Sequence, residues 1–119
     1  MSTTRTIGRA MPPERVTYIL VDESLSAPQV AVQAVHAAQS LSHEQGALVG
    51  DTSVVICTVS SGMVQNFYNL TRHNLSFLKI NYKSAIFFEP PQQKFTACAF
   101  LVENNAEARR PFRRFRLFK

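Results

Sequence analysis

The stretch RVTYILV, residues 15–21, is the first of two apolar runs that decide the fold. It is rich in β-branched and aromatic residues and almost continuously apolar, which is typical of a strand buried on both faces. A second run of this kind, SVVICTV, spans residues 53–59. Residues 26–44 between them predict one long helix, so the three elements form a βαβ unit with parallel strands. We expect the first strand to be central.

Both ends of this first helix carry terminal signals. Ser26 can cap the helix while Gln29 bonds back to it, and Pro28 falls in the first turn, where its missing N–H costs nothing. Gly46 is the expected left-handed residue that ends the helix after about Glu44. The helix therefore fills most of the connection between the two strands.

The second half of the chain continues the alternation of helices and strands. An apolar seam that starts at Val64 predicts a second helix reaching Leu78, capped by one of the two serines before it. Residues 83–89 and 95–102 are further strands, and their link is too short for a parallel crossover, so they form an antiparallel hairpin. The expected architecture is a three-layer α/β/α sandwich with a four-stranded mixed sheet, in the order β-α-β-α-β-β plus a C-terminal helix.

The composition fits one compact domain. The chain has 119 residues, of which 45% are hydrophobic and 18% charged, so a core can form without disulfide or metal staples. Residues 1–14 lack apolar periodicity and are expected to be a flexible tail. Residues 15–119 form the single domain with a basic C-terminal segment, 104–119, in which Pro111 predicts a short or distorted helix.

The cysteine spacing and the hydropathy argue against a disulfide-bonded, metal-binding or membrane protein. Cys57 and Cys98 stand far apart in apolar runs without CxxC or Cys/His spacing, which is typical of buried reduced thiols. Neither a metal nor another cofactor is expected. The sequence holds no apolar run of signal-peptide or membrane-spanning length, so we expect a cytoplasmic protein that does not enter membranes.

One stripe of the first helix is polar yet uncharged. It contains Gln29, Gln33, His36, Ser40 and His43, which recur at spacings of four and three residues. Solvated helix faces usually carry Lys and Glu, so this stripe favours a surface where a partner docks closely. An ordinary solvated face is the alternative, and the sequence leaves open whether the chain forms a homodimer.

These residues resemble the first-helix motif of the type 2 peptidyl-tRNA hydrolases, Gly-Lys-x-x-x-Gln-x-x-His-Ala directly after the first strand. Residues 28–37 match its spacing without a gap and keep the Gln, His and Ala as Gln33, His36 and Ala37. The strand that ends in Glu89 and the following strand with Thr96 are similar to the family's second block. The resemblance covers residues 15–119.

The resemblance implies cleavage of the ester bond between a peptide and the terminal ribose of tRNA, without a metal. His36 or Glu89 would orient or deprotonate water, and Thr96 with Gln33 would stabilise the oxyanion. This chain departs from the family at two positions, where the usual Lys is Gln29 and the usual Asp is Glu89. The alternative is a non-catalytic RNA- or protein-binding module that keeps the fold and has lost hydrolysis.

The basic C-terminal segment is the remaining candidate for a binding role. The formal net charge is +5 and the sequence pI is about 9.7, so phosphate-bearing partners are worth testing. Arginines that alternate with phenylalanines can bind phosphates and stack on bases. We predict that tRNA or another RNA contacts a surface formed by Gln29, Arg109, Arg110, Arg113, Arg114 and Arg116. The alternative is that the phenylalanines pack the segment onto the core, and both roles can hold together.

Overall fold

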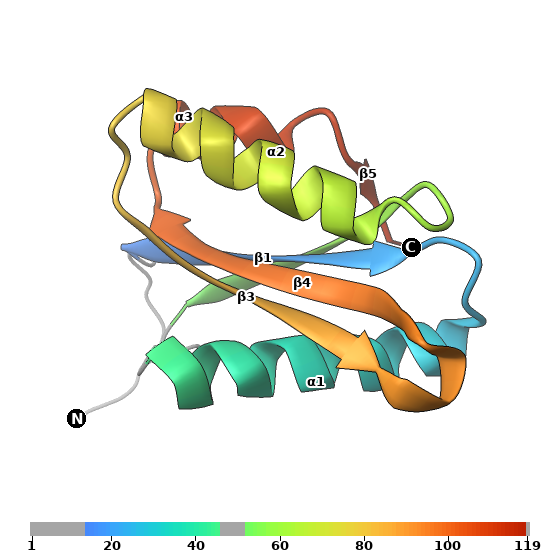
Figure 1. Ribbon diagram of the computed structural model, residues 1–119. Coiled ribbons are helices and arrows are strands. Elements are labelled where there is room, and N and C mark those ends of the chain that lie inside the picture. The colour runs from blue at the N-terminus through green and yellow to red at the C-terminus, as the bar shows by residue number, and fades with distance from the viewer. Residues whose placement is uncertain (1–13, 46–51, 119) are drawn as a thin grey trace.

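The computed structural model describes residues 14–45 and 52–118. One mixed sheet has the strand order β3-β4-β1-β2-β5 (Figure 1). The strands are β1 (Arg15–Asp22), β2 (Ser53–Val59), β3 (Tyr82–Glu89), β4 (Lys94–Glu103) and β5 (Arg116–Leu117). The helices are α1 (Ala27–Gln45), α2 (Val64–Phe77) and α3 (Ala106–Arg109), with the 3₁₀ turns η2 (Pro90–Gln92) and η3 (Arg110–Phe112).

Strand β1 lies in the middle of the sheet, as its continuous apolar pattern predicts. It pairs with β2 in parallel and with β4 in antiparallel orientation. Strands β3 and β4 form the predicted antiparallel hairpin, with η2 as the link. The mixed sheet and the βαβ unit are therefore confirmed.

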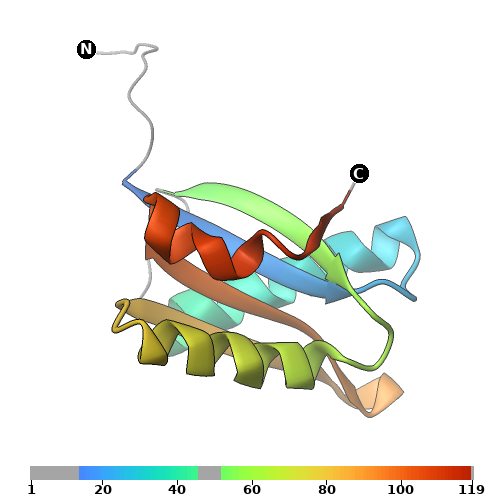
Figure 2. The same cartoon turned by 90° about the horizontal axis from the view of Figure 1, so that it is seen from above.

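Helix α1 covers one face of the sheet, and α2 with α3 covers the other (Figures 1 and 2). Successive side chains of β1 alternate between the two faces. Tyr18 and Leu20 belong to the cluster on the α2 side, whereas Ile19 and Val21 belong to the cluster on the α1 side. Because helices cover both faces, nearly every position of β1 is apolar.

The prediction of a four-stranded sheet is wrong, because the end of the chain adds β5 to the sheet. Leu117 of β5 lies opposite Cys57 of β2 in antiparallel register, and the Phe118 N–H donates to the Ile56 carbonyl at 2.8 Å. A two-residue strand is too short to show periodicity, so the sequence pattern gave no sign of it. The predicted short or distorted C-terminal helix is confirmed as α3 followed by η3.

The start of α1 has the predicted capping box. The Ser26 N–H donates to Gln29 Oε1 at 3.1 Å, and the Gln29 N–H donates to Ser26 Oγ at 3.4 Å. The predicted terminator Gly46 and the predicted tail over residues 1–13 lie outside the described residues. Glu14, the last residue assigned to that tail, is exposed.

The predicted serine cap of α2 is wrong. Helix α2 begins at Val64, and Met63 occupies the capping position without a side-chain hydrogen bond. The Met63 N–H instead donates to the Ser60 carbonyl at 3.0 Å, and Gly62 has a φ of 75°. This left-handed turn separates both serines from the first turn of the helix.

Candidate functional site

A β-bulge at the start of β4 turns Thr96 towards α1. The register between β3 and β4 shifts between Phe87 and Phe88, which leaves Thr96 as an extra residue of β4. Regular alternation would place Thr96 on the face of Cys98, which belongs to the cluster on the α2 side. The Thr96 hydroxyl instead contacts Gln33 of α1, because a bulge rotates the extra residue out of the alternation.

Thr96, Gln33 and Glu89 form a hydrogen-bonded chain. Thr96 Oγ1 donates to Gln33 Oε1 at 2.6 Å, and Gln33 Nε2 donates to Glu89 Oε2 at 2.7 Å. Thr96 is fully buried, Gln33 is 4% exposed and Glu89 is half-buried. The two inner side chains therefore fix the position of the outer carboxylate. Three of the four predicted catalytic residues meet in this chain, and their roles stay predictions.

His36 lies one turn after Gln33 and borders this chain on the same face of the sheet. Its ring stacks on Phe87, with 4.6 Å between the ring centroids and an interplanar angle of 11°. The side chain is half-buried. It also lines a shallow, mostly apolar cavity of about 320 Å³ on α1, together with Ala31, Val32, Val35 and Gln39.

Asp22 is a buried carboxylate at the same end of the sheet, and it is not among the residues predicted from the sequence. It is the last residue of β1, and its side chain is fully shielded from solvent. The Ser24 N–H donates to its Oδ1 at 2.8 Å, and the Gly62 N–H donates to its Oδ2 at 3.1 Å. Lys94 Nζ lies 3.4 Å from Oδ2. A polar residue that ends a buried strand, next to a parallel neighbour, is the sequence signal that identifies such a position.

Several opposing effects act on the pKa of Asp22. Burial alone raises the pKa of this carboxyl, but the hydrogen bonds from Ser24 and Gly62 and the positive charge of Lys94 hold it below its ordinary value. The carboxylate is therefore charged at neutral pH and has its partners in place.

Lys94 contacts Asp22 and lies opposite Glu89 in the β3–β4 hairpin. It is the register partner of Glu89 across the hairpin, so the two side chains start about 5 Å apart at Cβ. The ammonium group lies against Asp22, and the Glu89 carboxylate lies against Gln33. The C-terminal end of β1 therefore lies beside one cation, the Lys94 ammonium. Its contact is the Asp22 carboxylate, and Glu89 lies opposite Lys94 in the neighbouring strand.

We expect the Asp22→Asn substitution to lower the free energy of unfolding at pH 7 by about 1–3 kcal/mol, because it removes the charge from buried hydrogen bonds. The folded-state pKa lies below the ordinary value of 3.8, so the carboxylate stabilises the fold above that value. This stabilisation is lost as the pH falls through the folded-state pKa. Urea unfolding at pH 7 and between about pH 5 and pH 2 measures both effects.

The matched control is Glu23→Gln, which removes a carboxylate from the exposed neighbouring residue. The Asp22→Asn variant should lose part of the acid sensitivity that the control retains. Equal slopes of stability against pH in wild type and in Asp22→Asn would contradict the assignment.

Gln29 lies on α1, whereas Arg109 and Arg114 contact residues on the other face of the sheet. The six residues predicted to bind RNA are thus not all on one face of the sheet. Arg109 Nε donates to the Tyr18 hydroxyl at 2.7 Å, and Arg114 Nη2 donates to Thr71 Oγ1 of α2 at 3.2 Å. Both contacts lie on the face opposite α1. Phe112 and Phe115 of the segment belong to the α2-side cluster, whereas Phe118 packs against the α1-side cluster.

The individual residues of the predicted RNA surface differ in exposure. Gln29 is exposed, and its side-chain oxygen is engaged in the capping box. Burial lowers the pKa of Arg114, whose guanidinium also lies 4.8 Å from the Phe115 ring centroid. Arg110, Arg113, Arg114 and Arg116 are exposed, whereas Arg109 is half-buried. RNA binding by these residues stays a prediction.

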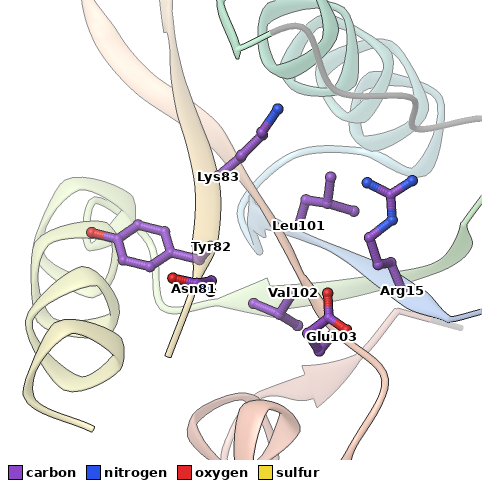
Figure 3. A pocket seen from close by; sticks show the side chains of 7 residues that line it. All are labelled: Arg15, Asn81, Tyr82, Lys83, Leu101, Val102 and Glu103. Carbon is purple, nitrogen blue, oxygen red and sulfur yellow. The ribbon is translucent and has the colours of Figure 1, made fainter. Parts of the chain in front are cut away.

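A cavity of about 150 Å³ lies at the opposite end of the sheet (Figure 3). Figure 3 shows Arg15, Lys83 and Leu101 extending towards α1, whereas Tyr82 turns towards α2. The remaining lining residues are Asn81, Val102 and Glu103. None of the predicted site residues lines this cavity.

Cys57 and Cys98 are buried free thiols, as predicted. Burial raises the pKa of Cys57 to about 11 and raises that of Cys98 further, so both are protonated at neutral pH. Over residues 14–45 and 52–118, no group of three or more His, Cys, Asp or Glu side chains is placed to hold a metal ion. Within the same part of the chain, no helix combines the length and the apolar character needed to cross a membrane.

Comparison with known proteins identifies a similar fold. No family model matches the sequence, and no curated protein matches it. The structure is similar to that of the protein of unknown function Atu0240 from Agrobacterium tumefaciens strain C58, with a TM-score of 0.56 and 8% sequence identity. The match covers 89% of this chain and 98% of that chain. At this identity the similarity concerns the fold alone.

Proposed function

We propose that this protein is a cytoplasmic peptidyl-tRNA hydrolase-like esterase with an α/β/α layered fold. Its substrate is the ester that joins a peptide to the terminal ribose of tRNA. The observation that carries the proposal is the chain Thr96–Gln33–Glu89. Two segments that resemble separate blocks of the family, 56 to 63 positions apart, meet there in two short hydrogen bonds.

Glu89 is the proton acceptor in this proposal. Gln33 fixes one carboxylate oxygen, Oε2, while Oε1 takes a proton from a water molecule. The water oxygen attacks the ester carbonyl carbon and forms a tetrahedral intermediate. Its collapse breaks the bond to the ribose oxygen, which receives the proton, and the peptide leaves with a free carboxyl group. Glu89 is favoured over His36 because the hydrogen-bonded chain orients it, whereas the His36 ring is stacked on Phe87.

Lys94 stabilises the oxyanion of this intermediate. Its ammonium is held by Asp22 at 3.4 Å and lies across the ladder from Glu89, where a preorganised charge is effective. In this proposal Lys94 supplies the positive charge that the family's Lys would supply at the position of Gln29. Thr96 and Gln33 are positioning residues, because the Thr96 hydroxyl hydrogen is donated to Gln33 and Gln33 donates to Glu89.

The experiment that tests the proposal measures peptide release from a defined peptidyl-tRNA by wild type, by Lys94→Met and by Lys79→Met. We expect wild type to release peptide and Lys94→Met to be roughly 10²-fold slower, since one electrostatic contact to the oxyanion is lost. Lys79 is exposed directly after α2, on the other face of the sheet, and its variant should match wild type. The melting temperature of each variant separates loss of activity from loss of fold.

A specific observation favours a second candidate, a non-catalytic module that binds RNA. Gln33 and Thr96 are both almost fully buried, and Gln29 is engaged in a helix cap. In this case wild type binds tRNA without releasing peptide, and Lys94→Met changes only the affinity. Filter binding of tRNA, run beside the cleavage assay, separates the two functions.

A further inference from the structure

A polar cavity lies between β1, the end of β4 and α3, on the face opposite the Thr96–Gln33–Glu89 chain. Its volume is about 420 Å³, which is within the size range of small-molecule sites. The residues that line it are Tyr18, Asn104, Asn105, Ala106, Arg109 and Arg113. Two cationic side chains and no carboxylate are thus among its described lining residues.

The side-chain oxygen atoms of this lining accept hydrogen bonds within the protein. The Tyr18 hydroxyl accepts from Arg109 Nε at 2.7 Å, and Asn104 Oδ1 accepts from Arg109 Nη1 at 3.1 Å. Asn105 Oδ1 accepts from the Ala108 N–H at 2.8 Å. The tyrosine hydrogen, the Asn105 amide hydrogens and the guanidinium hydrogens of the two arginines are donors. Because the side-chain oxygens of the lining already accept hydrogen bonds and the remaining polar groups are donors, the cavity favours an anionic ligand.

Arg109 is held in a fixed position, and this reduces the entropy cost of binding. Its guanidinium has the two hydrogen bonds just described and lies 5.8 Å from the centroid of the Tyr18 ring. Tyr18 is fixed in turn, because its ring stacks on Phe112 with 4.0 Å between centroids. Arg113 is exposed at the edge of the cavity, where it can close on a bound group.

We propose that this cavity is a binding site for a phosphate group. Guanidinium groups match phosphate oxygens in geometry and charge, and they bind them through paired hydrogen bonds. The carboxylates nearest in sequence, Glu103 and Glu107, do not line the cavity. The phosphate belongs to a free nucleotide or to the end of an RNA strand. The site lies apart from Glu89 and Lys94, so the proposal does not depend on ester hydrolysis.

Calorimetric titration of the full chain with inorganic phosphate, adenosine monophosphate and a short oligoribonucleotide with and without a 5′-phosphate tests the proposal. We expect at least one phosphate-bearing probe to bind, and Arg113→Ala to weaken its binding roughly tenfold to a hundredfold, since a charged hydrogen bond is lost. The control Arg72→Ala removes the same charge from an exposed residue of α2 that does not line the cavity. It should change the affinity by less than about threefold, because it removes no donor from the cavity and the effect of an exposed charge is screened by salt.

A second variant tests the geometry of the site. Tyr18→Phe keeps the ring that packs against Phe112 and removes the hydroxyl that holds Arg109. It should weaken binding of the same probe while urea unfolding remains a single cooperative transition. Binding of the nucleotide and of inorganic phosphate identifies a small-molecule site, whereas binding of the 5′-phosphorylated RNA alone identifies an RNA end. Absence of binding by all four probes, or equal losses in Arg113→Ala and Arg72→Ala, would overturn the proposal.

Discussion

The Glu89→Gln variant is expected to release peptide from peptidyl-tRNA roughly 10²–10⁴-fold more slowly than wild type, which is the usual contribution of a general base. The amide cannot take a proton from water. It retains an oxygen that accepts from Gln33 Nε2, which lies 2.7 Å from the carboxylate in the wild-type chain. The variant therefore cannot act as a general base but keeps the hydrogen bond to Gln33. Initial rates under saturating substrate, with tRNA affinity measured in parallel, separate kcat from binding.

Glu107→Gln is the matched control for this experiment. Glu107 is exposed in the first turn of α3, on the other face of the sheet, so the rate should equal that of wild type. His36→Ala discriminates between the two proposed proton acceptors. A variant of Glu89 with the full wild-type rate, beside a His36→Ala variant without activity, would transfer the role of the base to His36.

The sequence predicted those parts of the fold that depend on local periodicity. Strand β1 is apolar at successive positions because helices cover both faces, and the Ser26–Gln29 capping box needs only residues within one turn. Strand β5 was not predicted because two residues are too few to show the alternation of a strand. Its existence depends on pairing with Cys57 and Thr58, which lie far away in the chain.

The candidate site was predictable only in part, for a geometrical reason. Gln33, Glu89 and Thr96 were found by a resemblance, whereas alternation along β4 places Thr96 on the wrong face. The bulge that corrects this depends on the register of two strands. Asp22 and Lys94 are 72 positions apart, and their contact follows from the order β4-β1 in the sheet, which the sequence does not specify.

The basic C-terminal segment was the most ambiguous part of the sequence. An RNA-binding tail and a packed segment predict the same alternation of arginine and phenylalanine. The structure places Phe112 and Phe115 in the core, so the arginines project from a segment that is part of the fold. Arg109 and Arg113 can act as a defined pair only because this packing holds them beside Tyr18.

The Phe112→Ala substitution is expected to lower the free energy of unfolding by about 3–5 kcal/mol, the usual effect of removing a phenylalanine from a core. Phe112 is 2% exposed and stacks on Tyr18 at 4.0 Å. Its ring also contacts Phe100 edge-on, with centroids 5.5 Å apart. Small domains have total stabilities of about 5–15 kcal/mol, so this single change removes a large fraction. Urea unfolding at pH 7, monitored by circular dichroism, measures the difference.

Phe77→Ala is the control of identical chemistry, because Phe77 is 79% exposed at the end of α2. Its effect should stay within about 0.5 kcal/mol, as for most surface substitutions. A loss in Phe112→Ala as small as that in Phe77→Ala would mean that the C-terminal segment contributes little to the core. The stack of Tyr18 on Phe112 also fixes the C-terminal segment that contains Arg109. The Phe112→Ala variant should therefore bind phosphate more weakly than Phe77→Ala. A destabilised but folded Phe112→Ala protein with full phosphate affinity would separate the packing of the segment from the binding site.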